Sequence, residues 1–240
     1  MLRPAGLVLL VLTLAAPAQA QTADDVVALN LRSKGGEKWQ GITSVKMSGR
    51  MSSQGMELPM TVYARRPNHT RQELDVKGAK LVQAFDGTTG WIVNPLAGSE
   101  TPQEMPAPLV QMMRNTADFD GPLVNYKQKG HAIELVGRDK VGETDVHHLK
   151  ITLKSGDVQH SYLDATTGVE LKKTQEVDLG TGEQQTLETR MSDYRPVNGV
   201  MVAHAITQLM NGKPVADMTI DRVEFNASDV QDSLFRMPAR

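Results

Sequence analysis

The sequence predicts a mainly β protein: an antiparallel meander that carries one helix at its N-terminus and another in the middle of the chain. Two observations predict this class. From Ile42 onward apolar and polar residues alternate with a period of two, which is typical of strands with one buried face. Turn-forming clusters at 86–90, 198–199 and 211–212 separate these runs. We expect about eleven or twelve strands.

Residues 1–20 have the composition of a secretory signal peptide. A positive charge at Arg3 is followed by an apolar run at 7–16 and an A-x-A cleavage motif at 18–20. This run is too short for a membrane-spanning helix, which needs roughly twenty apolar residues. We therefore expect cleavage of the signal peptide and a single domain at 21–240.

The composition excludes several classes of protein. The formal net charge is −2 and no basic stripe is present, which argues against a nucleic-acid partner. The chain contains no cysteine, so it has neither a disulfide framework nor an N-terminal cysteine to carry lipid. An exported protein without disulfides suits the bacterial periplasm, and we expect a freely diffusing monomer there.

Two segments have helical periodicity. An acidic pair at 24–25 suits the first turn of a helix, and the pattern predicts one helix over 23–38, with the glycines at 35–36 as its end or a kink. A proline-rich stretch begins at residue 94, and we predict a loop there. Apolar residues at helical spacing then predict a short amphipathic helix over 108–117.

Methionine is unusually frequent, with thirteen residues against four phenylalanines and four tyrosines. Its flexible thioether suits a surface that adapts to variable apolar shapes, although ordinary core filling is an alternative. Two short helices cover such a sheet only in part, which leaves room for a pocket. The apolar residues expected to line this cavity are Met47, Met51, Met56, Leu58, Met60, Val62, Trp91, Leu109, Met112, Met113, Leu149, Ile151 and Met218.

One charged residue continues the apolar series. In the strand that starts at Met56 the even positions are apolar, and the series ends at Arg66, which by alternation points inward. One interpretation is a solvated residue at the strand end. The other is a gate that donates hydrogen bonds to carbonyls of the covering loops and releases them when a ligand enters.

Motifs of catalysis are missing from the sequence. It has no G-x-S-x-G elbow, no P-loop and no G-x-G-x-x-G. His147 and His160, which we expect near each other across a hairpin, are a candidate pair for zinc, but packed or solvated histidines are the alternative. We therefore predict no enzyme, no catalytic residue, no cofactor and no metal.

Three short motifs resemble one known family. Residues 66–71 read R-P-N-H-T-R, residues 86–95 read D-G-T-T-G-W-I-V-N-P, and residues 235–238 read F-R-M-P. In this order they resemble the LolA-like periplasmic proteins, the outer membrane lipoprotein-sorting protein family. The resemblance implies an unclosed β-barrel whose concave face is capped by helices. It also places Arg66 on the family's inward arginine, which latches the lid.

The resemblance implies a carrier rather than a catalyst. Its cavity would hold the acyl chains of a lipoprotein or lipid in transit to the outer membrane, with an inner-membrane exporter and an outer-membrane acceptor as partners. The alternative is a lipid-sensing regulatory or accessory protein of the same fold that acts on a membrane partner. The chain departs from the family because methionine and aliphatic residues replace the usual aromatic ones, which leaves the ligand open.

Overall fold

The computed structural model describes residues 21–53, 55–179 and 182–238, so the predicted signal peptide lies outside the described residues. Thirteen strands form one sheet, in which every paired neighbour is antiparallel and β6 and β7 occupy the two edges. The strands are β1 (Ser44–Ser53), β2 (Met56–Arg65), β3 (His69–Val76), β4 (Ala79–Phe85), β5 (Gly90–Asn94), β6 (Ser99–Glu104), β7 (Ala132–Val141), β8 (Thr144–Thr152), β9 (Val158–Asp164), β10 (Glu170–Asp178), β11 (Gln184–Val197), β12 (Val200–Met210) and β13 (Lys213–Phe225).

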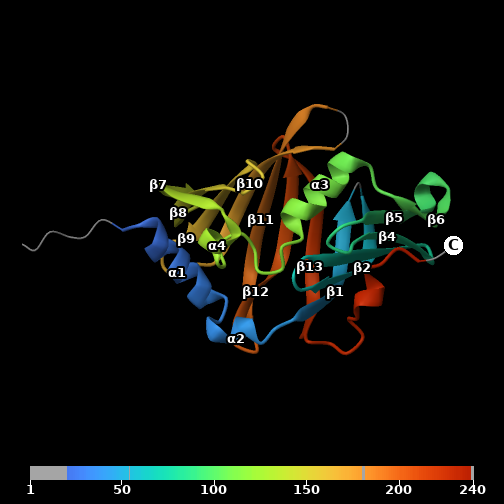
Figure 1. The fold of residues 1–240 in the computed structure, drawn as a ribbon, viewed down its shortest axis with the longest axis horizontal. Helices are drawn as coiled ribbons and strands as arrows, with labels where there is room; N and C mark the ends of the chain where they lie inside the picture. The colour runs from blue at the N-terminus through green and yellow to red at the C-terminus, as the bar shows by residue number, and fades with distance from the viewer. Residues whose placement is uncertain (1–20, 54, 180–181, 239–240) are drawn as a thin grey trace, which may run out of the picture.

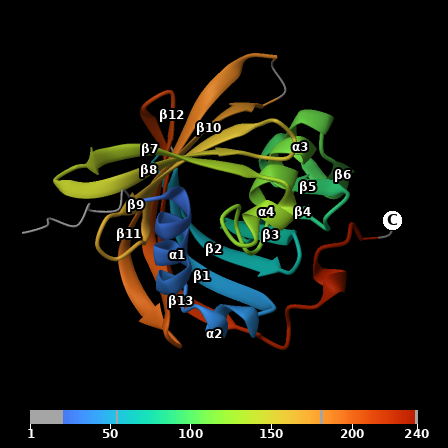
Figure 2. The ribbon, with the colours of Figure 1, turned by 60° about the vertical axis from the view of Figure 1, so that its left-hand side comes forward.

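The sheet curls into an open barrel, which confirms the predicted fold class. Its order runs from β6 down to β1, continues through β13 and then descends to β7, so the first and the last strand of the chain pair with each other. Figure 2 shows the sheet as an arc with helices on its concave side. These helices are α1 (Ala23–Ser33), α2 (Glu37–Gln40), α3 (Ala107–Thr116) and α4 (Tyr126–Lys129).

Helix α1 closes one end of the arc. A capping box between Thr22 and Asp25 starts this helix. Val26 and Val27 then pack into a core cluster with Leu149 and Leu163 of β8 and β9. The prediction of one helix over 23–38 is wrong in that this segment forms two helices. The chain breaks at 35–36, where both glycines have positive φ of 85° and 57°, and α2 begins after them.

Helix α3 lies close to its predicted range of 108–117 and runs in front of the central strands (Figure 1). The segment before it, predicted as a loop, contains the additional strand β6. This strand pairs only with β5 and is mostly exposed, so its sequence lacks an apolar alternation. No helix in the described parts of the chain has the length and apolar character needed to cross a membrane.

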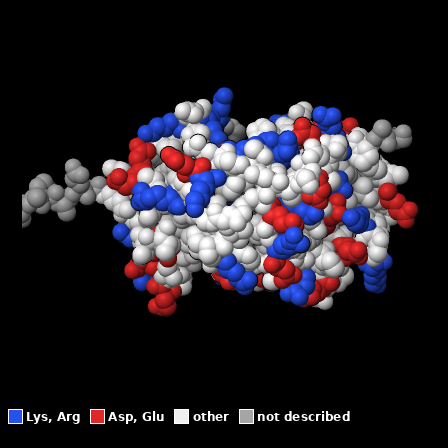
Figure 3. Space-filling model, turned by 90° about the horizontal axis from the view of Figure 1, so that it is seen from below, with Lys and Arg blue, Asp and Glu red and all other residues white. Residues whose placement is uncertain are grey.

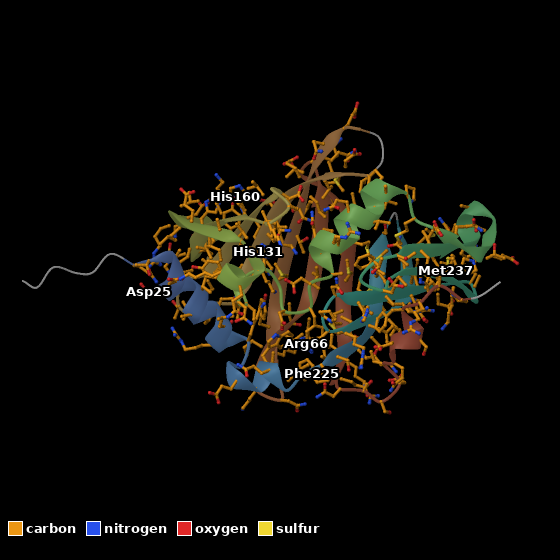
Figure 4. The ribbon with its side chains drawn as sticks, viewed as in Figure 1. Asp25, Arg66, His131, His160, Phe225 and Met237 are labelled. Atoms are coloured by element: carbon orange, nitrogen blue, oxygen red, sulfur yellow. The ribbon has the colours of Figure 1, made fainter. Side chains whose placement is uncertain are left out.

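A separate apolar cluster lies on the convex side of the sheet. The C-terminal segment passes over β4 and β5, where Met237 packs against Val82, Ala84 and Trp91 (Figure 4). The Trp91 indole donates a hydrogen bond of 2.7 Å to the carbonyl of Phe235. The segment therefore covers the outer face of these strands, opposite the helices.

Candidate functional site

The concave side carries a methionine-rich apolar surface. Its buried centre consists of Met60, Leu74 and Ile220, which come from β2, β3 and β13. Register places Met51 opposite both Leu58 and Met218, so the surface continues across neighbouring strands. We call this set the methionine face; its half-buried members are Met47, Met51, Leu58, Val62, Leu81, Met218 and Val223.

The methionine face is on the same side of the sheet as α3. Leu74 and Thr70 of β3 are four residues apart, so both point to the same side of the sheet. Thr70 pairs with Phe85 of β4, and Phe85 pairs with Gly90 of β5, so these positions face that side too. A Cβ placed on Gly90 would lie only 3.2 Å from a methyl carbon of Val110 in α3. The helix therefore packs directly on this side of β5, where glycine leaves room for Val110.

Helix α3 is a loose cover. It contacts β4 and β5 on one side of the arc and β10 on the other. None of its residues is buried, and its apolar side chains, Leu109, Val110, Met112 and Met113, are all only partly covered. A helix that spans the concave side without burying a side chain leaves apolar surface available to a ligand.

Cavities border α3 on both sides. One of about 250 Å³ lies between the helix and β9–β10 and is lined by Met112, Gln159 and Val177, among others. Another of about 420 Å³ lies towards β4–β5, beside Met105 and Val110. Near the C-terminal end of α3 are two more, of about 380 Å³ and 120 Å³. The space around the helix is therefore incompletely filled.

Arg66 ties the covering segments together at the lower end of the sheet (Figure 4). Its guanidinium donates hydrogen bonds to the carbonyls of Ile42, at 2.7 Å, and Trp39, at 2.8 Å. It also forms an ion pair of 2.8 Å with Asp120 in the loop after α3. The indole of Trp39 donates to the same carboxylate at 2.7 Å and stacks on Phe119. One side chain thus joins the segment after α1 to the segment after α3.

The structure brings most of the predicted cavity residues together. Met47, Met51, Leu58, Met60, Val62 and Met218 belong to the methionine face, and Leu109, Met112 and Met113 lie on α3. Whether they bind a ligand stays a prediction, as does the gating role of Arg66.

Four of the residues predicted to line the cavity lie outside the methionine face and α3. Trp91 lies on the convex side under the C-terminal segment, because Gly90 takes the inward position of β5. Leu149 and Ile151 are exposed to only 0% and 1%, since α1 covers β8, although Ile151 also borders the 120 Å³ cavity. Met56 stands at the tip of the β1–β2 hairpin with 43% of its surface exposed.

The expectation that His147 and His160 lie near each other is wrong. His147 is buried beside Leu149 on the α1 side, where its ring nitrogen lies 3.2 Å from the Gln21 amide. His160 instead meets His148 at 2.7 Å, on the opposite face of the sheet. Burial lowers the pKa of both His147 and His148. Among residues 21–53, 55–179 and 182–238 no three metal-ligating side chains form a cluster.

Sequence reasoning missed a group of inward polar residues. Gln159 donates to Gln175 at 2.9 Å, and both side chains are buried on the concave side. Ser161 and Lys173 continue the same inward rows on β9 and β10, directly opposite each other. The alternation in residues 158–163 contained the signal, because Gln159 and Ser161 share their face of the strand with the core residue Leu163.

Comparisons with known proteins support the fold. Neither a protein-family model nor a curated protein matches the sequence. The LolA superfamily protein NE2245 from Nitrosomonas europaea is similar in structure, with a TM-score of 0.58, 12% identity, and coverage of 90% of this chain and 98% of that one. A DUF1329 family protein from Desulfovibrio piger has a TM-score of 0.60 and 11% identity, with coverage of 90% and 100%. The chain has the LolA-like open-barrel fold.

Proposed function

We propose that this protein is a periplasmic carrier that binds the acyl chains of a lipid or lipoprotein between the methionine face and α3. The observation that carries the proposal is the loose cover: a helix with no buried residue lies across a half-buried apolar surface and is bordered by cavities. The fold shared with the LolA superfamily protein supports the same class of function.

The energetics are favourable for a chain-like ligand. Each buried CH₂ group contributes about 0.8 kcal/mol, so an acyl chain can offset much of the cost of leaving a membrane. Methionine side chains adapt to different chain shapes at little cost in strain. On this proposal, α3 moves away from the sheet to admit the chain, and Arg66 holds the covering segments closed when no ligand is present.

The surface charge is consistent with a freely diffusing protein. On the face seen in Figure 3, basic and acidic residues are interspersed, and uncharged residues run between them. Such a surface lacks the single-signed field that draws a protein to nucleic acid. The protein partners in this proposal are an inner-membrane exporter, which loads the carrier, and an outer-membrane acceptor, which unloads it.

The experiment is to titrate the purified protein with a fluorescent fatty acid, 11-(dansylamino)undecanoic acid. We expect saturable binding, and about tenfold weaker binding by the Met51→Gln/Met218→Gln variant, because these two half-buried side chains lie opposite each other on the methionine face. Val136→Gln, an exposed position on the edge strand β7, is the control and should bind normally. Equal binding by all three proteins would contradict the proposal.

Mass spectrometry provides an independent measurement. Protein isolated from a periplasmic extract without detergent should retain a lipid that denaturation releases. If no lipid is recovered and the fluorescent fatty acid also fails to bind, the carrier function is excluded.

A further inference from the structure

The smallest of the four cavities around α3 has two lysines and a buried asparagine in its wall. It encloses about 120 Å³ between the C-terminal end of α1, the segment that follows α3, and strands β8–β10. Only two large apolar side chains, Leu123 and Ile151, contribute to its wall. The polar side chains that line it are Asn30, Lys34, Asn115, Thr116, Asp118, Gln159, Ser161, Glu170 and Lys173.

Two lysines face this cavity, and neither forms an ion pair with a described residue. The Lys34 ammonium donates to the backbone carbonyl of Asp120 at 3.1 Å and forms no ion pair with any residue that the structure describes. Lys173, half-buried on β10, likewise has no ion pair within the described ranges. Uncompensated ammonium groups inside a protein are costly, so their presence needs a reason.

The nearby carboxylates are already engaged. Asp118 pairs with Lys129 at 2.6 Å, and Asp120 pairs with Arg66. Glu170 accepts a hydrogen bond of 2.5 Å from the Ser161 hydroxyl. Glu170 forms no ion pair with a described residue, but its charge acts on the Lys34 ammonium. With the Asp118–Lys129 pair counted as neutral, two ammonium groups of the wall face this one carboxylate, which leaves one positive charge in excess.

Two further observations concern buried polar groups at this cavity. Burial lowers the pKa of the Lys34 ammonium, because the surrounding carboxylates compensate only part of its lost hydration. Asn30 is 2% exposed and donates to the carbonyl of Gly168 at 2.8 Å, yet its side-chain oxygen is buried without a partner. A native structure rarely leaves such an acceptor unpaired, which points to a group that supplies a donor.

We propose that this cavity binds the phosphate group of an amphiphile, with Lys34 and Lys173 contacting phosphate oxygens and the Asn30 oxygen accepting from a phosphate hydroxyl. The inference rests on the proposed carrier function, which supplies the apolar part of the ligand. The cavity shares Asn115 and Gln159 with the 250 Å³ cavity beside α3, so a chain attached to the phosphate can extend along α3 towards Met112 and Val177.

The test compares three probes by isothermal titration calorimetry, all below their micelle concentrations. Dodecyl phosphate carries both chain and charge, 1-lauroylglycerol carries a chain without charge, and inorganic phosphate carries charge without a chain. The wild-type protein should bind dodecyl phosphate at least about tenfold more tightly than 1-lauroylglycerol, since charge-assisted hydrogen bonds contribute about 1.5–3 kcal/mol.

Matched variants assign the preference to the cavity. Lys34→Met/Lys173→Met should remove the preference for phosphate and leave the affinity for 1-lauroylglycerol within about twofold, because the methylene stems are kept. Lys172→Met is the control: this neighbouring lysine points to the opposite face, where its ammonium lies over the Tyr162 ring at 3.8 Å. It should retain the full preference.

The outcomes separate this inference from the carrier function. If both amphiphiles bind wild type equally, or if Lys34→Met/Lys173→Met keeps the preference, the phosphate site is excluded while the carrier function stands. If inorganic phosphate binds in a lysine-dependent manner and neither amphiphile binds, the cavity is a site for free phosphate and the carrier function is excluded.

Discussion

Helices α1 and α3 both cover the concave side of the sheet, but they are packed in opposite ways. Helix α1 buries Val26 and Val27, which are exposed to 0% and 5%, in a core cluster with β8 and β9. Helix α3 buries none of its residues, and its apolar side chains are only partly covered. The comparison teaches that α1 contributes to the packed core, whereas α3 is held by few buried contacts, as the proposed movement for a ligand requires.

The largest effect on stability is expected from a substitution in the core beneath α1. Leu149→Ala should lower the free energy of unfolding by about 3 kcal/mol, because it leaves a cavity in a core that α1 seals. Urea denaturation followed by circular dichroism measures this. A loss below about 1 kcal/mol would show that the α1 side is as loosely packed as α3.

Arg66 connects the two regions, and removing it should have the next largest effect. Arg66→Leu loses two hydrogen bonds to carbonyls and leaves Asp120 without its ion pair, so we expect a loss of about 2 kcal/mol. Hydrogen exchange should accelerate at the backbone amides of 118–121. The control is Arg65→Leu, whose ion pair with Asp232 is more exposed and should contribute less than about 1 kcal/mol.

Replacing Lys34, which lines the 120 Å³ cavity, should increase the stability instead of lowering it. Lys34→Met should raise the stability by about 1 kcal/mol, because a partly uncompensated ammonium is removed from a buried site. The lowered pKa means that the unfolded chain binds more protons at high pH. The gain should therefore be largest below the folded-state pKa and vanish as the pH rises through the ordinary lysine pKa of 10.5. Thermal denaturation at pH 7 and pH 10 measures both effects, and equal stability of the two proteins at pH 7 would contradict them.

The smallest effect on stability should come from α3 itself. Met113→Ala should change the free energy of unfolding by less than about 1 kcal/mol, since this side chain is only half-buried. Its affinity for the fluorescent fatty acid should nevertheless fall by about threefold, because the side chain contributes to the apolar cover. A large loss of stability with unchanged affinity would reverse the roles assigned to the two helices.

The local patterns of the chain determined much of this structure. Period-two alternation and turn residues predicted the antiparallel meander, the range of α3 and the inward position of Arg66, because each depends on residues close together in sequence. The strand β6 escaped prediction because an exposed edge strand needs no apolar alternation.

Tertiary structure alone decided three other features. The C-terminal segment determines that Trp91 is buried on the convex side, through a hydrogen bond to a residue 144 positions away. Helix α1 determines that Leu149 belongs to a sealed core. The polar cavity unites Lys34 and Lys173, which lie far apart in the chain and carry no motif. Alternation fixes which residues share a face of a strand, but the segment that packs on that face comes from a distant part of the chain.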